Sequence, residues 1–139
     1  MIYAKIKLLE NGKLPEKKHS GDACYDCYAR ESVEIYDGDR KKIPLGFALE
    51  LPQGYEAVIR PRSGLSSHYV DCCIGTIDSN YRGEVNAIIQ NWSDEILKIH
   101  KGDRICQMAI REVPQVMFEK VDELSPSDRN ENGFGSTGI

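Results

Sequence analysis

The residues with the clearest capacity for chemistry lie in a polar stretch at positions 75–84. Asp78, Tyr81 and Arg82 fall within five residues, and the flanking glycines allow a turn to approach a ligand closely. A carboxylate held beside bound phosphates can orient and deprotonate a water molecule, which hydrolysis of a phosphoanhydride requires. Asp78 could equally cap the turn, so the stretch by itself leaves both interpretations open.

A second polar group, at positions 61–65, follows a predicted strand. Arg62 offers a planar fork, Ser63 a hydroxyl and Gly64 a backbone N–H, and together these form a compact anion site. An ordinary turn fits the same residues. Ser63 is not expected to be a covalent nucleophile, because no histidine or lysine accompanies it in a recognisable pattern.

The end of the chain, residues 129–139, is rich in glycine and poor in apolar surface, so it cannot offset its own ordering entropy. This tail nevertheless holds Arg129, the ring of Phe134, and the hydroxyls of Ser136 and Thr137. An arginine, a flat ring and hydroxyl donors would suit an aromatic base joined to phosphates. A frayed terminus is the alternative.

The elements that must position these residues are expected to be strands. Short runs of β-branched and aromatic residues recur between turn sequences, and no window shows a sustained 3.6-residue period. This spacing predicts an all-β sandwich or barrel. A short helical turn at 65–69 and a hinge at 125–128 are also expected. The predicted strands cover residues 2–9, 32–36, 47–51, 55–59, 84–90 and 96–99.

The composition limits the functions that fit. With 139 residues, 40% of them hydrophobic, the chain is large enough for one domain with one core. It has no apolar run near the ~18 residues of a membrane span and no secretory start, so a cytoplasmic protein is expected. The odd number of cysteines, five, favours reduced thiols. A net charge of −4 argues against coating nucleic acid, so local arginines must hold any anionic ligand.

Taken in order, the polar stretches resemble the sequence motifs of the trimeric dUTP pyrophosphatase (dUTPase) family. Residues 23–29 resemble the first motif, and the second to fourth correspond to 61–65, 75–84 and 102–107, with the tail as the fifth. The resemblance extends from position 14 to the C-terminus. Five ordered motifs are a specific match, so the chain is identified as similar to this family over nearly its whole length.

The resemblance implies a fold and an assembly. The family has a jelly-roll-like β barrel or sandwich and forms a homotrimer, in which each active site lies between subunits and is closed by the flexible C-terminal tail of another subunit. The implied organisation here is a β body over residues 1–124 and a flexible C-terminal lid over 125–139, within a single domain.

The resemblance also implies an activity: hydrolysis of dUTP to dUMP and pyrophosphate with Mg²⁺, which removes dUTP and supplies dUMP for thymidylate synthesis. Asp78 would activate the water that attacks the α-phosphorus. Tyr81 would pack on the deoxyribose and leave no room for a 2′-hydroxyl. Asp26 would act on Mg²⁺ only through water, because the three phosphates would bind the metal; this agrees with the reluctance of magnesium to lose its water.

The remaining implied contacts divide by the part of the substrate that they bind. In the lid, the arginine and the hydroxyls would hold the γ end, and the aromatic ring would stack on uracil. The residues implied are, for uracil, Cys72, Thr76, Ile77 and Asn86; for the phosphates, Arg62, Ser63, Gly64 and Gln107; and from the lid, Arg129, Phe134, Gly135, Ser136 and Thr137.

The cysteines mark the clearest departure from the family pattern, because Cys24 and Cys27 stand where the family usually has glycine and leucine. Together with Cys72 and Cys73 they raise the alternative of a zinc site. Adjacent cysteines in a strand point to opposite faces, however, so buried and inert thiols are favoured.

The sequence leaves the roles of two arginines open. Arg82 and Arg104 could contact the substrate, or they could form structural ion pairs with Glu84 or Asp103.

Three functions fit the sequence. The first is dUTP hydrolysis, which is favoured because every catalytic position that the family requires is filled. The second is a dCTP deaminase-like enzyme on a related fold, which would need a different catalytic acid. The third is a nucleotide-sensing regulatory protein on the same fold, and the sequence leaves a regulatory protein partner open.

Overall fold

The computed structural model describes residues 1–138, which form ten strands and one short helix. In chain order these are β1 (Lys5–Leu8), β2 (Tyr25–Tyr28), β3 (Val33–Ile35), β4 (Arg40–Glu50), β5 (Tyr55–Arg60), α1 (Ser63–Ser66), β6 (Val70–Cys72), β7 (Gly75–Ile77), β8 (Glu84–Asn91), β9 (Leu97–Ile99) and β10 (Arg104–Glu112). Within these residues no helix is long and apolar enough to cross a membrane.

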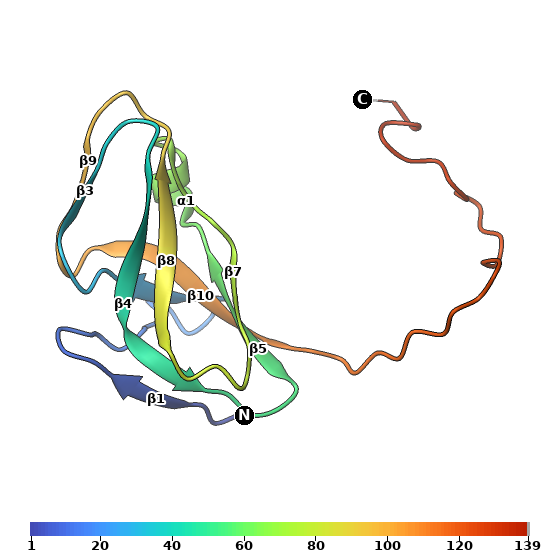
Figure 1. The fold of residues 1–139 in the computed structure, drawn as a ribbon, viewed down its shortest axis with the longest axis horizontal. Helices are drawn as coiled ribbons and strands as arrows, with labels where there is room; N and C mark the ends of the chain where they lie inside the picture. Colours follow the sequence, from blue (N-terminus) through green and yellow to red (C-terminus); the bar gives the residue numbers. More distant parts are fainter. Residues whose placement is uncertain (139) are drawn as a thin grey trace.

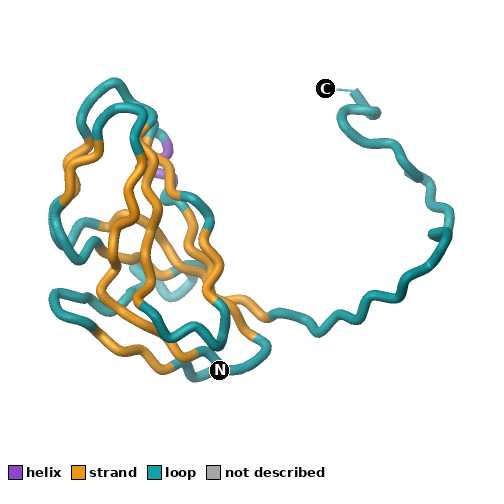
Figure 2. The backbone as a smooth tube through the Cα atoms, in the orientation of Figure 1, coloured by secondary structure: helices purple, strands orange, loops and turns teal. Residues whose placement is uncertain are grey.

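Two four-stranded antiparallel sheets enclose the core. One has the strand order β1-β4-β8-β6 and the other β2-β10-β5-β7, while β3 pairs with β9 in a separate two-stranded sheet. Neighbouring strands therefore come from distant parts of the sequence, as the colours of Figure 1 show, and Figure 2 shows how little of the body is helical. The predicted all-β, jelly-roll-like fold is confirmed.

Alternating residues of β4 and β8 supply the centre of the core. Ile43, Leu45 and Phe47 of β4 and Val85 and Ile89 of β8 are at most 1% exposed. Because successive side chains of a strand point to opposite faces, the residues between them are free to face away from this core. The core thus fixes the register of β4 against β8, and with it the position of the chain just before β8.

A bulge in β4 lies beside the start of β8. Pro44 is opposite Asn86, but Ala48 is opposite Glu84, so four residues of β4 span two residues of β8. Gly46, inside the bulge, has a φ of 77°, a backbone conformation that glycine adopts without strain. Proline cannot donate to a sheet ladder, and it is tolerated at such a bulge.

The sequence predicted the apolar strands better than the polar ones. All six predicted strands coincide with observed strands, and the expected helical turn is observed two residues earlier, as α1. The predicted strands leave out β2, β7, β10 and the first half of β4, and β6 was expected only as the strand that holds Cys72 and Cys73. Polar residues interrupt the apolar pattern in β2 and β10, and β4 begins with three basic residues and a proline.

Regular structure ends with β10 at Glu112. The N–H of Val113 still donates to the Gly54 carbonyl oxygen at 2.8 Å. Beyond it the chain reaches position 138 without a strand or a helix, and nearly every residue is exposed. We call residues 113–138 the C-terminal segment; Figure 1 shows that it leaves the body and follows a wide arc outside it.

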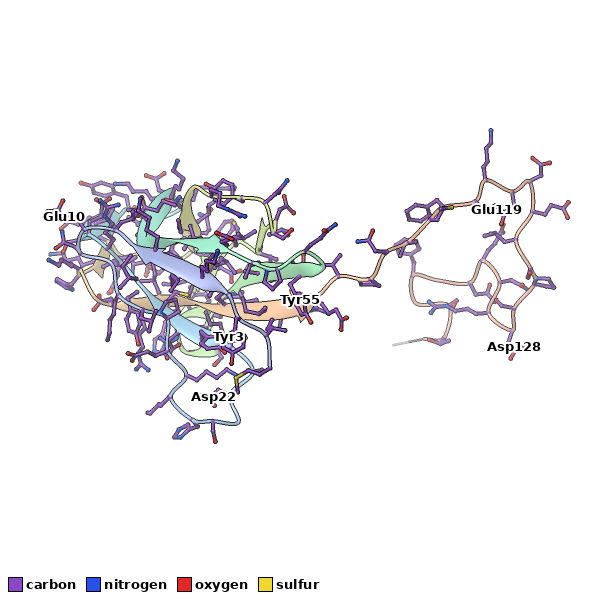
Figure 3. All side chains as sticks on the ribbon, turned by 90° about the horizontal axis from the view of Figure 1, so that it is seen from below. Tyr3, Glu10, Asp22, Tyr55, Glu119 and Asp128 are labelled. Atoms are coloured by element: carbon purple, nitrogen blue, oxygen red, sulfur yellow. The ribbon has the colours of Figure 1, made fainter. Side chains whose placement is uncertain are left out.

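The course of the C-terminal segment bears on the expected lid. Figure 3 places Glu119 and Asp128 well outside the body that carries Asp22 and Tyr55. The division into a body over 1–124 and a lid over 125–139 stays a prediction. Its last residue, Ile139, lies outside the described part of the chain.

Candidate active site

The first part of the candidate site is a pocket at the turn between β7 and β8, which we call the hairpin pocket. Its volume is about 220 Å³, and β7 is fixed beneath it by pairing with β5. The structure brings together here five of the predicted site residues: Thr76, Ile77, Asp78, Tyr81 and Asn86. The full lining is Gly75, Thr76, Ile77, Asp78, Tyr81, Glu84, Val85 and Asn86.

Tyr81 folds back on its own hairpin. Its N–H donates to the Asp78 carbonyl oxygen at 3.1 Å, which closes a tight turn, and its hydroxyl donates to the Glu84 carbonyl oxygen at 3.2 Å. The ring lies against Gly83, where a Cβ would collide with it, so a larger residue there would displace the ring of Tyr81. The tyrosine is still 45% exposed, which leaves a ring surface available to a ligand.

The hairpin pocket contains two carboxylates that differ in their hydrogen-bond partners. Glu84 Oε1 accepts hydrogen bonds from Arg30 Nη1 at 2.8 Å and from the Gly46 N–H at 3.0 Å. The Asp78 side chain is exposed, and among the described residues no hydrogen bond or ion pair reaches its carboxylate. Asp78 is therefore the carboxylate that is free to act on a bound water or ligand.

The second part of the site is a charged group that we call the arginine cluster: Asp26, Arg62, Arg104 and Gln107. Asp26 accepts hydrogen bonds from Arg62 Nε and Arg104 Nη1, each at 3.1 Å, and Arg62 also donates to the Arg104 carbonyl oxygen at 3.1 Å. Gln107 Nε2 donates to the Pro61 carbonyl oxygen at 2.8 Å. Two guanidinium groups against one carboxylate leave the cluster positive, which suits an anionic ligand.

A cavity of about 360 Å³ adjoins the arginine cluster. The sequence predicted Asp26 and Gln107 here, and Ser63 and Gly64 follow Arg62 directly at the exposed start of α1. It missed Arg60, the last residue of β5, because a strand-end arginine has no distinctive pattern. The cavity is lined by Asp22, Ala23, Cys24, Asp26, Arg60 and Gln107.

The structural ion pairs considered for Arg104 and Arg82 are wrong. Arg104 pairs with Asp26, because Asp103 turns back to accept a hydrogen bond from the His100 N–H at 2.8 Å. Arg82 donates to carbonyl oxygens of its own hairpin, since the Glu84 carboxylate is taken by Arg30 and the β4 bulge. No sequence pattern indicated that Asp26 and Arg30 would be these partners, because both lie far away along the chain.

The hairpin pocket and the arginine cluster lie at opposite ends of β5. Ile77 is opposite Ala57 in the antiparallel register of β7 and β5, so Asp78 lies near the level of Glu56. Arg62 is six residues further along the chain, and six residues of strand span about 20 Å. One copy of the chain therefore cannot bring Asp78 and Arg62 to the same phosphorus atom.

The predicted lid residues lie away from both parts of the site. Phe134 is fully exposed, and Arg129 Nε donates to the Asn132 carbonyl oxygen at 2.6 Å, within the tail itself. The tail follows the outer course of the C-terminal segment in Figure 1. The structure does not bring these residues to the hairpin pocket or arginine cluster of the same chain: Arg129, Phe134, Gly135, Ser136 and Thr137.

Three of the five cysteines are buried, in agreement with the prediction of inert thiols: Cys27, Cys72 and Cys106. The prediction is wrong for Cys73, which is exposed, and for Cys24, which is half-buried. Within residues 1–138 no group of three or more metal-binding side chains is placed to hold an ion. Cys72 belongs to β6 and is not part of the hairpin pocket, so its role at uracil stays a prediction.

Two of the buried thiols, Cys72 and Cys106, have pKa values raised above the ordinary range. Hydrogen bonding with Cys106, followed by burial, raises the pKa of the Cys72 thiol. Hydrogen bonding with Cys27, which lies opposite on β2, raises the pKa of Cys106. Within residues 1–138 the zinc interpretation finds no support in the arrangement of these cysteines.

An all-β body with an exposed carboxylate in a small pocket and a separate cluster of arginines is the arrangement of a protein that binds phosphorylated ligands. Within that class the chain belongs to the dUTPase family, whose family model matches residues 10–138. This membership makes the protein a nucleotide pyrophosphohydrolase. The family was predicted from the order of the five motifs, and the match confirms it.

Individual relatives agree over the whole chain. The deoxyuridine 5′-triphosphate nucleotidohydrolase of Alkaliphilus metalliredigens (strain QYMF) is 45% identical and covers 100% of this chain and 99% of the relative. The dUTPase of Staphylococcus bacteriophage 80alpha, solved with dUPNHPP, has a TM-score of 0.93 and 29% identity, covering 99% of both chains. A mutant dUTPase from phage phi11 of S. aureus, described with a structural Mg(II) ion, has a TM-score of 0.80 and 27% identity, covering 87% of this chain and 97% of that chain.

Proposed function

We propose that the protein hydrolyses dUTP to dUMP and pyrophosphate, and so removes dUTP and supplies dUMP for thymidylate synthesis. The observation that carries this proposal is the hairpin pocket, where a free carboxylate lies beside a tyrosine ring and two strand edges. Family membership supports the same substrate, because relatives that match the whole chain bear the name deoxyuridine 5′-triphosphate nucleotidohydrolase.

In this proposal the hairpin pocket binds the nucleoside. Asn86 Nδ2 donates to the Glu84 carbonyl oxygen at 2.9 Å, so Asn86 Oδ1 can accept the N3–H of uracil, a proton that N3 of cytosine lacks. The backbone of Thr76 and Ile77 meets the remaining uracil edge. The exposed ring of Tyr81 packs on the deoxyribose and leaves no volume for a 2′-hydroxyl.

The chemical step needs one base and several donors. Asp78 takes a proton from a water molecule while the water oxygen attacks the α-phosphorus. The bond from the α-phosphorus to its bridging oxygen breaks, and pyrophosphate leaves while dUMP stays. Arg62, Gln107 and the start of α1 with Ser63 and Gly64 hold the phosphates and stabilise the charge that develops on their oxygens.

The residues of the arginine cluster fit a magnesium ion that the substrate itself carries. Both carboxylate oxygens of Asp26 accept hydrogen bonds from arginines, so Asp26 suits an outer contact through water better than direct ligation. Bound Mg²⁺ would neutralise phosphate charge and would take most of its ligands from the three phosphates and from water. Asp26 would then orient one of those waters.

The separation of the two half-sites supports a homotrimer with shared active sites. Because Asp78 and Arg62 of one chain are about 20 Å apart along β5, a complete site takes the hairpin pocket of one subunit and the arginine cluster of another. The C-terminal segment supports the same assembly, since it extends from the body and exposes a row of large apolar side chains that a partner would cover. These are Val113, Val116, Met117, Phe118, Val121 and Leu124.

The course of the tail supports its proposed role as a lid. The likeness to the bacteriophage 80alpha dUTPase solved with dUPNHPP covers 99% of this chain, so it includes the C-terminal segment. We propose that Arg129, Ser136 and Thr137 bind the terminal phosphate on another subunit, and that Phe134 stacks on the uracil there, with Gly135 giving the backbone access. Substrate would order this segment.

A substrate panel tests the proposed function. The full-length protein is incubated with Mg²⁺ and each deoxynucleoside triphosphate, and pyrophosphate and ammonia are both measured. We expect pyrophosphate from dUTP alone. Ammonia from dCTP would replace the proposal with deamination, and tight dUTP binding without any product would favour the nucleotide-sensing regulatory protein.

A further inference from the structure

We propose that Glu84 and Arg30 form a positioning pair that sets the place of Tyr81, and through it the preference for a deoxyribose over a ribose. In this proposal Glu84 lines the hairpin pocket, but the carboxylate of Glu84 and the guanidinium of Arg30 act through Tyr81 and do not bind the substrate. The inference rests on the proposed function, in which the Tyr81 ring packs on the sugar. It concerns a different property, namely the ratio between two substrates.

Glu84 stands at the junction between the hairpin and the sheet. It is the first residue of β8, so the hairpin before it lacks ladder bonds to β4. Its carbonyl oxygen accepts hydrogen bonds from the Tyr81 hydroxyl at 3.2 Å and from Asn86 Nδ2 at 2.9 Å. The two side chains proposed to contact sugar and base are therefore both located relative to one backbone atom.

The side chain of Glu84 fixes that backbone atom to the body. Its Oε1 accepts from Arg30 Nη1 at 2.8 Å and from the Gly46 N–H at 3.0 Å. The side chains of Arg30 and Glu84 are 28% and 24% exposed, so solvent screens this pair less than a surface pair. The bond from Gly46 joins the hairpin to the β4 bulge across 38 residues of sequence, and the pair with Arg30 spans 54 residues.

Arg30 and Gly46, which bind the Glu84 carboxylate, are themselves held in the body by several contacts. The Arg30 N–H donates to the Pro44 carbonyl oxygen at 3.0 Å, and the Leu9 N–H donates to the Gly46 carbonyl oxygen at 2.8 Å. Gly46 also packs so closely on Gly12 that a Cβ at either position would collide with the other. The bulge is a rigid support, so a change in the pair moves the hairpin and leaves the bulge in place.

The consequence is a specificity effect with a definite sign. Exclusion of a 2′-hydroxyl depends on contact between the ring and the sugar, so a hairpin free to move by a fraction of an ångström relieves the clash with UTP. Binding of dUTP, which has no hydroxyl to exclude, changes less. Loss of the pair should therefore lower the ratio of kcat/KM for dUTP to kcat/KM for UTP.

The experiment measures this ratio in four variants of the full chain. Glu84→Ala removes the anchor and should lower the ratio about tenfold, whereas Arg30→Met leaves the bond to Gly46 and should lower it about threefold. The double variant should match Glu84→Ala, because Arg30 acts only through Glu84. Glu84→Gln keeps an acceptor for both donors and should stay within about twofold of the unaltered protein.

A matched control separates positioning from charge. Glu50→Gln removes an ion pair of the exposed β1 edge, Lys5 to Glu50 at 2.9 Å, and should leave the ratio unchanged. A folded Glu84→Ala or Arg30→Met protein with the ratio of the unaltered chain would overturn the proposal; Arg30→Met serves if Glu84→Ala does not fold. If the unaltered chain failed to hydrolyse dUTP, the proposed function would fall, and calorimetric affinities for dUTP and UTP in the same variants would still decide the positioning claim.

Discussion

Asp78 and Glu84 show how two carboxylates of one pocket acquire different tasks. Glu84 is committed to Arg30 and the β4 bulge, so its charge is neutralised and its orientation fixed. Asp78 lies on the exposed turn, where it has no competing cation among the described residues. The sequence alone named Asp78 through its place in a motif, but the physical reason for its availability is visible only in the structure.

Replacing Asp78 with asparagine keeps the shape of the side chain and removes its capacity to accept a proton. We expect kcat for dUTP to fall by about 10²- to 10⁴-fold, with KM within a few-fold of its original value. Pyrophosphate release gives kcat, and calorimetry with dUTP shows that binding persists. A variant that retains its kcat would remove Asp78 from the role of water-activating base.

The buried thiols make stability depend on alkaline pH. The pKa values of Cys72 and Cys106 are raised in the folded state, first by hydrogen bonding between thiols and then by burial, so above a pH of about 8.5 the unfolded chain releases protons that the folded chain retains. The stabilisation is complete below that pH and is lost as the pH rises further. Urea unfolding at pH 7 and pH 10 should show a lower midpoint at pH 10.

Two cysteine variants distinguish the thiols from other alkaline effects. Cys106→Val removes a buried thiol, so it should reduce the difference between the two urea midpoints. Cys73→Ser alters an exposed thiol and should leave the difference as it was. An equal pH dependence in the two variants would contradict the assignment to the buried thiols.

The elements of the body differ in how far the sequence determines them. The strands with alternating apolar residues were predictable because the core alone specifies them. The sequence could not reveal the bulge in β4, since the Gly46 N–H donates to the carboxylate of Glu84, 38 residues away. The sequence also did not predict β2 and β10. Asp26 and Gln107 of the candidate site lie in these strands and interrupt their apolar pattern.

The tail is the element for which a simple deletion is most informative. None of the described residues 129–138 belongs to the core, so deletion of residues 129–139 should leave the melting temperature within a few degrees of the full chain. The proposed lid contacts would be lost, and kcat/KM for dUTP should fall by about 10²-fold or more. A truncated protein with full activity would exclude the lid role.

At the scale of the whole molecule, the sequence named candidate site residues through their motifs but did not indicate which of them lie together. Motif order along the chain says nothing about which residues share a face. The register of β5 with β7 places the hairpin pocket at one end of the strand and the arginine cluster at the other. The proposed homotrimer follows from that geometry together with the family resemblance.

Mixing two inactive variants tests the shared site. Asp78→Asn spoils the hairpin pocket and Arg62→Ala spoils the arginine cluster, so each protein alone should be nearly inactive. If a site takes one part from each of two subunits, random 1:1 reassembly should restore about a quarter of the sites. Activity is compared with the unaltered protein after unfolding and refolding of the mixture, and light scattering measures the mass of the assembly.

In that mixing experiment, no activity in a refolded trimer would mean that both parts come from the same chain. A monomer by light scattering would be equally incompatible with the shared site. Refolding each variant alone provides the baseline, because it exposes any activity that arises from refolding itself.

If the site is shared between subunits as proposed, the separation of roughly 20 Å between the two ends of β5, which follows from the rise of a strand, also makes catalysis a collective property. In that assembly a chain that has not met its partners carries both halves of a site and completes neither. Below the concentration at which subunits associate, the rate should therefore rise more steeply than in proportion to the amount of protein. Such an enzyme would have a threshold concentration, and below it newly made copies would not hydrolyse the nucleotide.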